Sequence, residues 1–597
     1  TPRGWGGTGL YPENPKATVI QKGYRHFHNR SLQTNLTLEQ NLSFITPGLK
    51  LSETFSIYNY KGSYYYKYRN YQRFQPYSDG DSINYFITGN QDTEFAITQT
   101  GTSRNTQNQR INVQVGLDYN RVFDRHGIFG SVNYHSDEYL IDGNNPTFVT
   151  RGFMGRLMYD YDNRFYTLFS YAVNGTGDFP TNNNIGFFPA LSMGWVVSNE
   201  SFLKNSQTVN FLKLRGSVGL TGNNDIAGQR FGYEQYYRDA NSQNMFGWNG
   251  TDAAKTLYEH TIANKNMTWE KALKTNIGFE SRIFKNLDVE FDVFYEKRND
   301  ILVSQHELAY FGFMNGKAND GIVSNKGLEL NAKWQKQIGK LSYYVQGTFS
   351  YAKNKIENMN EVPRSEEYMK RTGYSISQPF ALEAEGLFQS WDEINNPATP
   401  VHTFAAVQPG DIRYVDQNKD GYIDENDVIA LKDYYPITPE ISYGVFAGFS
   451  YSNFDLNLAG YGVAHRSVYL NGQNNWAFQN NGNVPQWASE RWAYYPEQGI
   501  DTRSTATYPR LSLGSNNNNW RNSSYWIRNA AYFRLGEVTV GYTLPLQATS
   551  KIEINKVRVY MTAVNLLTID GIKNVDPAVM TGHPFMKSYN VGLNINF

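Results

Sequence analysis

The chain has 597 residues, with 55 lysine and arginine residues against 55 aspartate and glutamate residues, so its formal net charge is +0. This balance supplies no excess of basic residues for a surface that would bind nucleic acid. The complete lack of cysteine excludes disulfides, thiolate metal sites and cysteine nucleophiles.

The chain is polar on average and yet rich in aromatic rings. Its mean hydropathy is -0.58, while aromatic residues make up 15% of it and include 45 tyrosines. A membrane-spanning barrel combines these properties because its strands alternate apolar and polar residues, its loops are polar and aromatic girdles lie at both interfaces. No stretch approaches the ~20 apolar residues of a membrane-spanning helix, and residues 1–30 lack the basic start and apolar run of a signal peptide.

Runs of about ten residues that alternate between apolar and polar side chains recur along the chain. They are clearest at 49–60, 110–123 and 556–567, where most outward positions carry aliphatic or aromatic residues. Alternation with period two indicates a barrel strand, and repetition makes the signal specific. We therefore predict about 17 strands, at residues 32–45, 49–60, 110–123, 127–136, 148–161, 164–173, 188–198, 210–220, 270–283, 287–299, 325–336, 341–353, 441–451, 454–464, 532–544, 556–567 and 588–597.

The connections between these strands are short on one side and long on the other. Short turns are predicted at 46–48, 124–126, 162–163, 284–286 and 452–453, and long connections at 61–109, 221–269, 300–324, 355–440, 465–531 and 568–587. Short periplasmic turns and long extracellular loops are typical of outer-membrane barrels. The predicted fold is therefore all-β, a transmembrane antiparallel β-barrel. Because an odd number of strands cannot close such a barrel, we expect a barrel of 22, with about five strands before residue 1.

The predicted last strand alternates up to the terminal phenylalanine, with its apolar series at Tyr589, Val591, Leu593, Ile595 and Phe597. Such an ending is of the kind that outer-membrane assembly machinery reads. We interpret these five residues as an assembly signal, and the alternative is an ordinary amphipathic edge strand.

Several segments resemble those of SusC-like TonB-dependent outer-membrane transporters. The segment YFRLGEVTVGYTLP at 532–545 is similar to the family's "lRLknvtLgYtlP" strand, and Asn565-Leu566-Leu567-Thr568 followed by Asp576-Pro577 resembles "NLfT…gyDPe". Upstream, the segments at 188–195, 214–223, 325–329 and 409–414 resemble "fPsvslGW", "lRaSyGltGN", "N.GvEl" and "pGdiky". The matches run from about residue 110 to 597, and their order and spacing together are specific.

The resemblance implies that residues 1–597 are the C-terminal barrel portion, without the plug domain, energy-coupling box and first strands of the family. It implies an outer-membrane location in a Gram-negative bacterium and a SusD-like surface lipoprotein as partner. The function that it implies is uptake of glycan oligomers or oligopeptides, energised by TonB through the missing N-terminal part. It implies no enzyme, and no nucleophile–base motif is evident. The alternative function is a passive or scaffold barrel in an outer-membrane assembly complex.

An acidic loop at 416–427, within the long connection 355–440, has the spacing of a calcium loop. Oxygen ligands fall at positions 1, 3, 5, 7, 9 and 12, and Gly421 supplies the sharp turn at position 6. We favour a structural calcium ion over a solvated acidic turn, because carboxylates this close repel one another unless a cation neutralises them. The predicted ligands are Asp416, Asn418, Asp420, the carbonyl of Tyr422, Asp424 and Asp427.

The long connection 465–531 is rich in rings and asparagines. Aromatic faces and amide groups suit sugars and peptide backbones, but the same rings could pack the loops against each other or against a lid. Both interpretations stay open at this point. The candidate ligand or lid contacts are Trp476, Trp487, Trp492, Tyr494 and Tyr495, together with Trp391 in the calcium-bearing connection.

Overall fold

The computed structural model describes the chain except for residues 1–3, 9–12, 69–70, 89–97, 100–105, 142–146, 226–229, 240–243, 247–251, 255–256, 306–315, 550–552, 573–574, 580–581 and 597. The chain forms two compact units. Unit 1 comprises Thr1–Arg121, Phe129–Arg156 and Ala172–Asp178. Unit 2 comprises Val122–Ile128, Leu157–Tyr171 and Phe179–Phe597.

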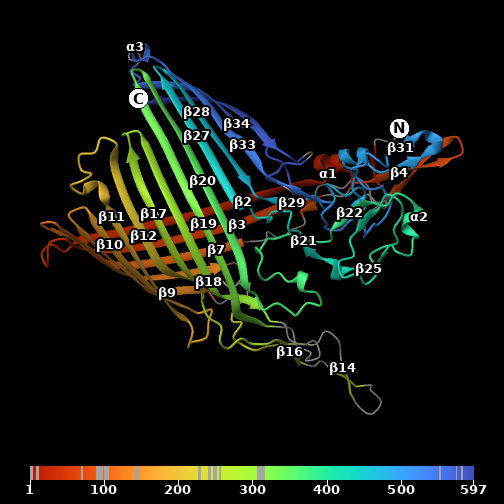
Figure 1. Cartoon of the computed structure of the whole chain (residues 1–597), viewed down its shortest axis with the longest axis horizontal. Helices are drawn as coiled ribbons and strands as arrows, with labels where there is room; N and C mark the ends of the chain where they lie inside the picture. Colours follow the sequence, from red (N-terminus) through yellow and green to blue (C-terminus); the bar gives the residue numbers. More distant parts are fainter. Residues whose placement is uncertain are drawn as a thin grey trace. The chain divides into compact units, whose positions relative to one another are not determined.

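The predicted strand set is confirmed, because each predicted range corresponds to one strand. In the part of the chain that the structure describes, seventeen long antiparallel strands form the sheet (Figure 1). They are β2 (Gly23–Asn41), β3 (Leu49–Tyr68), β7 (Thr106–Phe123), β8 (His126–Ile141), β9 (Phe148–Tyr161), β10 (Phe165–Thr176), β11 (Ile185–Val196), β12 (Val209–Asn223), β17 (Glu270–Ile283), β18 (Leu287–Ser304), β19 (Lys317–Ile338), β20 (Leu341–Asn358), β27 (Ile441–Tyr451), β28 (Phe454–Ala464), β33 (Tyr532–Thr543), β34 (Lys556–Asp570) and β35 (Ser588–Asn596).

Several strands are longer than the alternation predicts, mainly at the end that leads into a long connection. β18 continues to Ser304 and β20 to Asn358, while β19 already begins at Lys317. The hydrogen-bonded ladder between β19 and β20 runs unbroken except for one register shift near Ile322. Beyond the apolar band both faces of a strand are polar, so the ladder continues where the alternation fades.

The short turns lie at the predicted places, except that the first is longer than predicted and begins at residue 42, because β2 ends at Asn41. Several of these turns need left-handed backbone. Asp124, Asp162 and Asn163 have φ of 53°, 54° and 52°, and Phe284 and Lys285 have 53° and 62°. Aspartate and asparagine tolerate this conformation, which matches the twist of the flanking strands. We call this edge of the sheet the short-turn end and the opposite edge the long-loop end.

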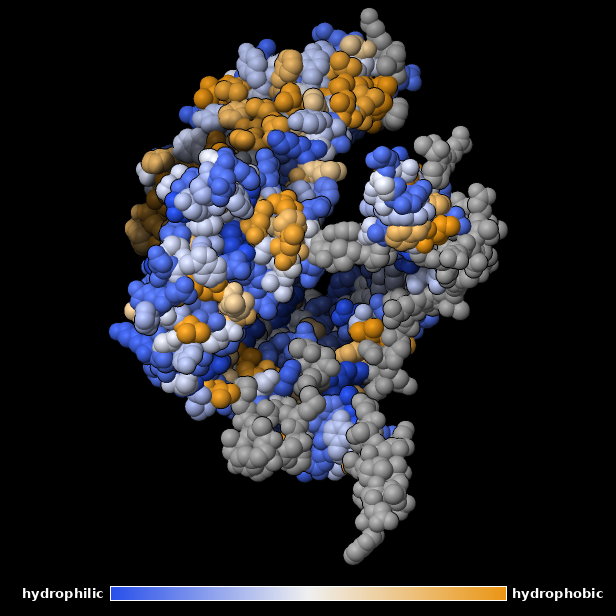
Figure 2. Space-filling view, turned by 90° about the vertical axis from the view of Figure 1, so that its right-hand side faces the viewer, coloured by the Kyte–Doolittle hydropathy of each residue, from blue (hydrophilic) through white to orange (hydrophobic). Residues whose placement is uncertain are grey.

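In unit 2, neighbouring strands are paired in register from β11 and β12 through β17, β18, β19, β20, β27, β28, β33 and β34 to β35. One face of this sheet carries exposed apolar residues such as Ile277, Val293, Val445 and Val540, and we call it the outer face. The opposite positions are mostly polar and form the inner face. Figure 2 shows hydrophobic side chains gathered at the top of the view, where the C-terminal strands run in Figure 1.

Two long connections of unit 2, residues 359–440 and 465–531, fold together into what we call the loop domain. Its elements lie beyond the long-loop ends of β27, β28 and β33 (Figure 1). Its short strands pair β21 with β26, β22 with β24, β23 with β25, β29 with β32 and β30 with β31. Their bounds, with those of its helix, are β21 (Phe380–Ala381), β22 (Ala384–Leu387), α2 (Trp391–Ile394), β23 (Val401–His402), β24 (Ile412–Tyr414), β25 (Tyr422–Ile423), β26 (Ile429–Ala430), β29 (Ser467–Tyr469), β30 (Tyr494–Tyr495), β31 (Ile500–Asp501) and β32 (Ile527–Asn529).

Other short elements lie in the remaining connections. In unit 1, β1 (Trp5–Gly6), β4 (Arg73–Asp79) and β5 (Ser82–Thr88) form a small sheet, α1 spans Pro15–Gln21, and β6 (Thr98–Gln99) pairs with β3. Unit 2 adds β13 (Tyr236–Asp239) paired with β16 (Leu257–Thr261), β14 (Asn244–Phe246) paired with β15 (Asp252–Ala254), and α3 (Leu546–Thr549). None of the helices described has the length and apolar character needed to cross a membrane.

Candidate functional site

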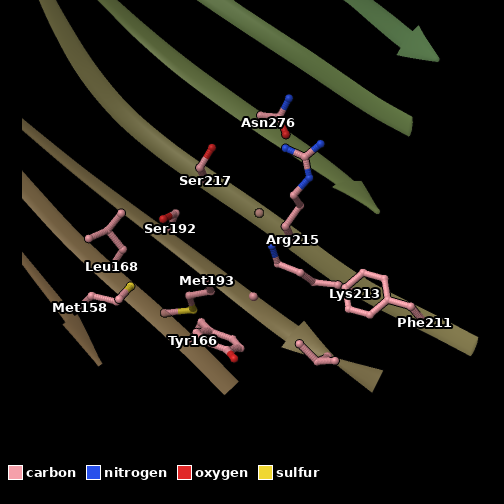
Figure 3. A pocket seen from close by; sticks show the side chains of 13 residues that line it. Met158, Tyr166, Leu168, Ser192, Met193, Phe211, Lys213, Arg215, Ser217 and Asn276 are labelled. Atoms are coloured by element: carbon pink, nitrogen blue, oxygen red, sulfur yellow. The ribbon is translucent and has the colours of Figure 1, made fainter. Parts of the chain in front are cut away.

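The inner face of unit 2 has a cavity of about 510 Å³ over β10, β11, β12 and β17. Lys213, Arg215 and Ser217 alternate along β12 and point into it, as Figure 3 shows. Asn276 lies beside Arg215 on the neighbouring strand, while Tyr166 and other less polar side chains line the opposite part. The wall therefore offers cationic, hydroxyl and amide groups next to an apolar ledge.

The cationic groups of this wall are held by carboxylates on the next strands. Arg215 Nη2 lies 2.6 Å from Asp292 Oδ2, and its Nε lies 3.2 Å from Glu280 Oε1. Lys213 Nζ lies 3.3 Å from the same Glu280 oxygen. The register causes these contacts, because Lys213 stands opposite Glu280 and Gly278 stands opposite both Arg215 and Asp292. Gly278 leaves room for the Arg215–Asp292 pair, since a Cβ there would lie 2.3 Å from Asp292 Oδ1.

A second inner-face cavity of about 500 Å³ continues along β18, β19, β20, β27 and β28. Its charged lining is acidic, with Glu290, Asp292 and Glu329. Asn331 Nδ2 donates to Glu290 at 3.4 Å, and Gln346 Nε2 donates to Asn331 Oδ1 at 2.9 Å. The inner wall thus passes from a cationic patch to an acidic and amide-rich one, which suits polar molecules that carry both donors and acceptors.

The loop domain is joined around one buried carboxylate, that of Asp411. Its Oδ1 accepts hydrogen bonds from Asn516 Nδ2 at 3.1 Å and Asn519 Nδ2 at 2.9 Å. Arg510 Nη2 donates to Oδ2 at 3.1 Å, and Arg510 Nε lies 2.8 Å from Oδ1. The backbone N–H of Gln408 donates to Oδ2 at 2.7 Å. Asp411 therefore ties the connection 359–440 to the connection 465–531.

A hydrophobic core surrounds this network. It contains residues from both connections, among them Ile412, Tyr414, Trp476, Tyr508 and Trp526. The rings of Trp487 and Tyr508 each meet Trp526 nearly edge to face, with centroids 5.7 Å and 5.5 Å apart. Burial raises the pKa of Tyr508 to about 12, so its hydroxyl stays protonated and donates to the carbonyl of Asn475.

The six predicted ring contacts separate into two groups. Trp476 and Trp487 pack in the core of the loop domain, and Trp492 is half-buried, with its ring against Gly410 and its Nε1 donating to Gln389. These three rings can affect ligand binding only indirectly, because they stabilise the loops that carry the exposed surface. Trp391 is 54% exposed and Tyr494 and Tyr495 are 44% and 49% exposed, although the Arg503 guanidinium covers one face of Tyr494, 3.8 Å from the ring centre. The remaining exposed ring surfaces can meet another molecule.

The acidic loop 416–427 forms a tight turn. The Asp416 carboxylate accepts the N–H groups of Lys419 and Gly421 at 2.7 Å and 2.9 Å. Asp427 is fully buried and accepts the N–H groups of Gln417 and Asp424, both at 2.8 Å. Burial raises the pKa of Asp427, as do the neighbouring Asp416 and Asp424 carboxylates, against the lowering effect of the two N–H groups.

The other predicted ligands of this loop lie nearby but bond within the loop. Asn418 Nδ2 donates to Asp420 Oδ2 at 2.8 Å, and the N–H of Tyr422 donates to Asp420 Oδ1 at 2.8 Å. Among the residues that the structure describes, no three His, Cys, Asp or Glu side chains are gathered as a ready metal cluster. Calcium binding by Asp416, Asn418, Asp420, Tyr422, Asp424 and Asp427 therefore stays a prediction.

The C-terminal strand β35 carries the predicted assembly signal on its outer face. Tyr589, Val591, Leu593 and Ile595 are all exposed, and they alternate with Asn590, Gly592, Asn594 and Asn596. Phe597, the last residue of the predicted signal, lies outside the described residues. The recognition of this ending by assembly machinery stays a prediction.

The alternation of apolar and polar residues predicts the strands, but it does not predict which polar residues contact each other across neighbouring strands. Arg215, Glu280 and Asp292 were not predicted as site residues, although each occupies a polar position of a predicted strand. Two residues of the quoted motifs also meet, because Arg534 Nη2 donates to Asp576 Oδ1 at 2.6 Å. The polar positions of the predicted strands, combined with the register between the strands, could have identified the residues of the inner wall.

No protein-family model matches the chain. It is 24% identical over 501 residues to a TonB-dependent receptor of Formosa agariphila, covering 78% of this chain and 47% of that protein. It is 25% identical over 465 residues to the TonB-dependent receptor SusC of Bacteroides thetaiotaomicron, covering 74% of this chain and 43% of that protein. The chain thus spans about half the length of the curated relatives that it matches.

A solved structure of the RagAB peptide importer in its open-open state has the same fold. Its superposition gives a TM-score of 0.72 at 18% sequence identity and covers 98% of this chain and 62% of that one. At this identity the likeness concerns the fold alone. It supports the assignment of the sheet as the wall of an outer-membrane barrel.

Proposed function

We propose that this chain, an outer-membrane protein of a Gram-negative bacterium and a relative of the TonB-dependent receptors, supplies the wall and extracellular loops of a nutrient importer. The short-turn end then faces the periplasm and the long-loop end faces outside. The observation that carries the proposal is the division of unit 2 into an apolar outer face and a charged inner face with two cavities. A lipid-facing wall needs the first, and passage of a hydrophilic solute needs the second.

We propose glycan oligomers or oligopeptides as the substrates. The inner wall presents Arg215, Lys213 and the acidic group of Glu290, Asp292 and Glu329, together with amides and hydroxyls. Such a wall can exchange hydrogen bonds with hydroxyls, amides and charged termini as they pass. Lys213 and Arg215 are paired with Glu280 and Asp292 across strands, and the wall carries groups of both signs, so it lacks the strong single-sign field of an ion-selective pore.

A surface lipoprotein of the SusD type would cover the loop domain, and TonB would supply energy through a plug domain. Trp391, Tyr494 and Tyr495 are the exposed rings of the predicted contact set. Exposed rings of this kind are typical of binding surfaces, since they contribute large contact areas at low entropic cost. We therefore assign these three rings to the lipoprotein or to the arriving oligomer.

Native mass spectrometry of the full-length protein, purified from its own outer membrane in mild detergent, tests this function. We expect a co-purifying lipoprotein and a bound glycan or peptide, whose uptake by cells stops when TonB is removed. The variant W391A/Y494A/Y495A should lose most of the lipoprotein or oligomer, because each large ring lost from an interface centre costs ~2 kcal/mol. The matched variant V401A/V484A/L513A, which removes three other exposed side chains of the loop domain, should keep both.

A protein that carries neither lipoprotein nor oligomer, in cells whose uptake does not depend on TonB, would contradict the importer. The passive or scaffold barrel would then be the function. Loss of the lipoprotein in both triple variants would show that the three rings have no special part in its binding.

We also propose that calcium stiffens the loop domain at 416–427. Every predicted ligand supplies oxygen, which is what Ca²⁺ prefers. The pKa of Asp427 is raised mainly by burial and further by repulsion from Asp416 and Asp424, and a cation would relieve that repulsion. The ion would be held by Asp416, Asn418, Asp420, the Tyr422 carbonyl, Asp424 and Asp427. It would contribute rigidity, not chemistry.

Thermal melting of the loop domain, followed by the fluorescence of its buried tryptophans, tests the calcium proposal. Calcium at ~100 times its Kd should stabilise the wild type by about 2.7 kcal/mol relative to chelator. The variant D416A/D420A should melt lower in calcium and respond to neither calcium nor chelator. The control D392A/D501A removes two exposed carboxylates elsewhere in the loop domain and should keep the calcium response. Identical melting of the wild type in calcium and in chelator would rule the site out.

A further inference from the structure

The outer face of β18, β19 and β20 changes from apolar to cationic toward the long-loop end. Register places Phe291, Leu330 and Phe349 in one row across the three strands, and Val293, Leu328 and Tyr351 in the next row. These positions face outward, because Val293, Leu330 and Phe349 have exposed side chains and the residues between them on the same strands, such as Asp292 and Glu329, carry the polar side chains of the inner face. They form the apolar band and the start of an aromatic girdle.

The two following rows are basic. Tyr295, Lys326 and Lys353 form one row, and Lys297, Ser324 and Lys355 form the row above it. Successive rows are ~7 Å apart, since a strand rises ~3.3 Å per residue. The lysines therefore stand directly above the aromatic row, at the level where lipid headgroups meet water.

The loop domain closes over these lysines and leaves a cavity of about 820 Å³. Lys326, Lys353 and Lys355 line it from the strands, and Lys432 lines it from the loop domain. Tyr435 adds a ring that stacks on His465, with centroids 4.2 Å apart. The cavity is thus a roofed basic cleft on the outer face of the wall, away from the inner-face cavities.

The carboxylates in this cleft do not balance its lysines. Lys355 lies 3.0 Å from Glu357, and Lys353 lies 3.8 Å from Glu440, which His465 also approaches at 3.3 Å. In the part of the chain that the structure describes, Lys326 and Lys432 make no ion pair. Four lysines against two glutamates leave an excess of positive charge beside the membrane.

We propose that this cleft binds the phosphorylated headgroup of an outer-leaflet glycolipid, the lipid A part of lipopolysaccharide. The phosphate lies among Lys326, Lys353 and Lys355, and the acyl chains descend along the rows of Val293, Leu328 and Phe349. Lysines draw anionic headgroups electrostatically and can reach them on long apolar stems. The basic cleft lies directly next to the apolar rows of β18, β19 and β20. This arrangement favours a lipid over a soluble anion, because only a lipid has acyl chains that can contact those apolar rows.

Lipid retention by the purified full-length protein in detergent tests the proposal and does not depend on import. Stripped wild-type protein, the variant K326Q/K353Q/K355Q and the control K285Q/K336Q/K340Q are each titrated with lipid A and followed by native mass spectrometry. The control lysines lie at the short-turn end of the same region, outside the cleft. Parallel titrations use dephosphorylated lipid A and inorganic phosphate as probes.

We expect the cleft variant to bind lipid A at least ~10-fold more weakly than wild type, since each lysine adds to the attraction for an anionic headgroup. The control variant should bind lipid A as tightly as the wild type does. Dephosphorylated lipid A should bind weakly to all three proteins, with the same affinity for the wild type and the control as for the cleft variant. Equal binding of lipid A by wild type and the cleft variant would overturn the site. Inorganic phosphate that binds as tightly as lipid A would assign the cleft to a free anion and overturn the lipid. Equal melting temperatures of the three proteins confirm that the variants are folded.

Discussion

The variant D411A is expected to open the loop domain while leaving the strands of the sheet intact. Asp411 is fully buried, and its carboxylate satisfies Asn516, Asn519, Arg510 and the backbone of Gln408. Alanine leaves a partly buried guanidinium and two buried amides without their acceptor. Removing one partner of a buried charged network costs about 3–5 kcal/mol, which is a large fraction of the stability of a small domain.

Hydrogen exchange measured by mass spectrometry checks this expectation. Peptides from 405–415 and 508–527 should exchange faster in D411A, with the increase in exchange rate set by the loss in the free energy of unfolding of the loop domain. The exchange rates of peptides from β18, β19 and β20 should stay as in the wild type. The control D501A removes an exposed carboxylate that pairs with Arg503 in the same domain, and both peptides should stay protected in it because an exposed ion pair contributes little to stability. Protection of both peptides in D411A at the wild-type level would contradict the assigned role of Asp411.

The sheet could be predicted because its signal is repeated in every strand. Residues such as Val559, Met561 and Leu593 alternate on the outer face whatever their partners are. Each strand can therefore be predicted from its own sequence. The loop domain has no such period. Asp411 lies in a segment that resembles a family motif, yet nothing local in the sequence shows that asparagines about a hundred residues later enclose it.

The same distinction, between features repeated in the sequence and features that depend on distant contacts, applies to the candidate site. The rings of 465–531 were visible in the sequence, but whether a ring is buried depends on contacts between distant loops, as for Trp476 against Trp526. The Arg215–Asp292 pair depends on register across β12, β17 and β18, which alternation alone does not fix. Composition and period thus identify a membrane barrel, and tertiary contacts decide which residues form its binding surfaces.

The variant R534M is expected to release the connection after β34 from the wall. Arg534 is nearly fully buried, donates to Asp576 Oδ1 at 2.6 Å and to Thr568 at 3.0 Å, and lies 4.8 Å from the ring centre of Phe585. Asp576 in turn accepts the N–H groups of Ala578 and Phe585. Breaking this pair should cost about 3–5 kcal/mol, and the double variant R534M/D576L should recover most of it, because no buried charge is then left unpaired.

The same pair predicts a dependence on pH. Burial opposes ionisation of Asp576, but the N–H of Ala578, the Arg534 guanidinium and the N–H of Phe585 outweigh it and hold the pKa of this carboxyl below its ordinary value of 3.8. A lowered pKa in the folded protein gives stability that is fully present above pH 3.8 and is lost as the pH falls through the lowered value. Hydrogen exchange around Asp576 and Phe585 should therefore accelerate in acid in the wild type, and R534M should show fast exchange already at neutral pH. If R534M/D576L exchanged as fast as R534M, the pair would act through packing, and the unpaired charge would not be the cause.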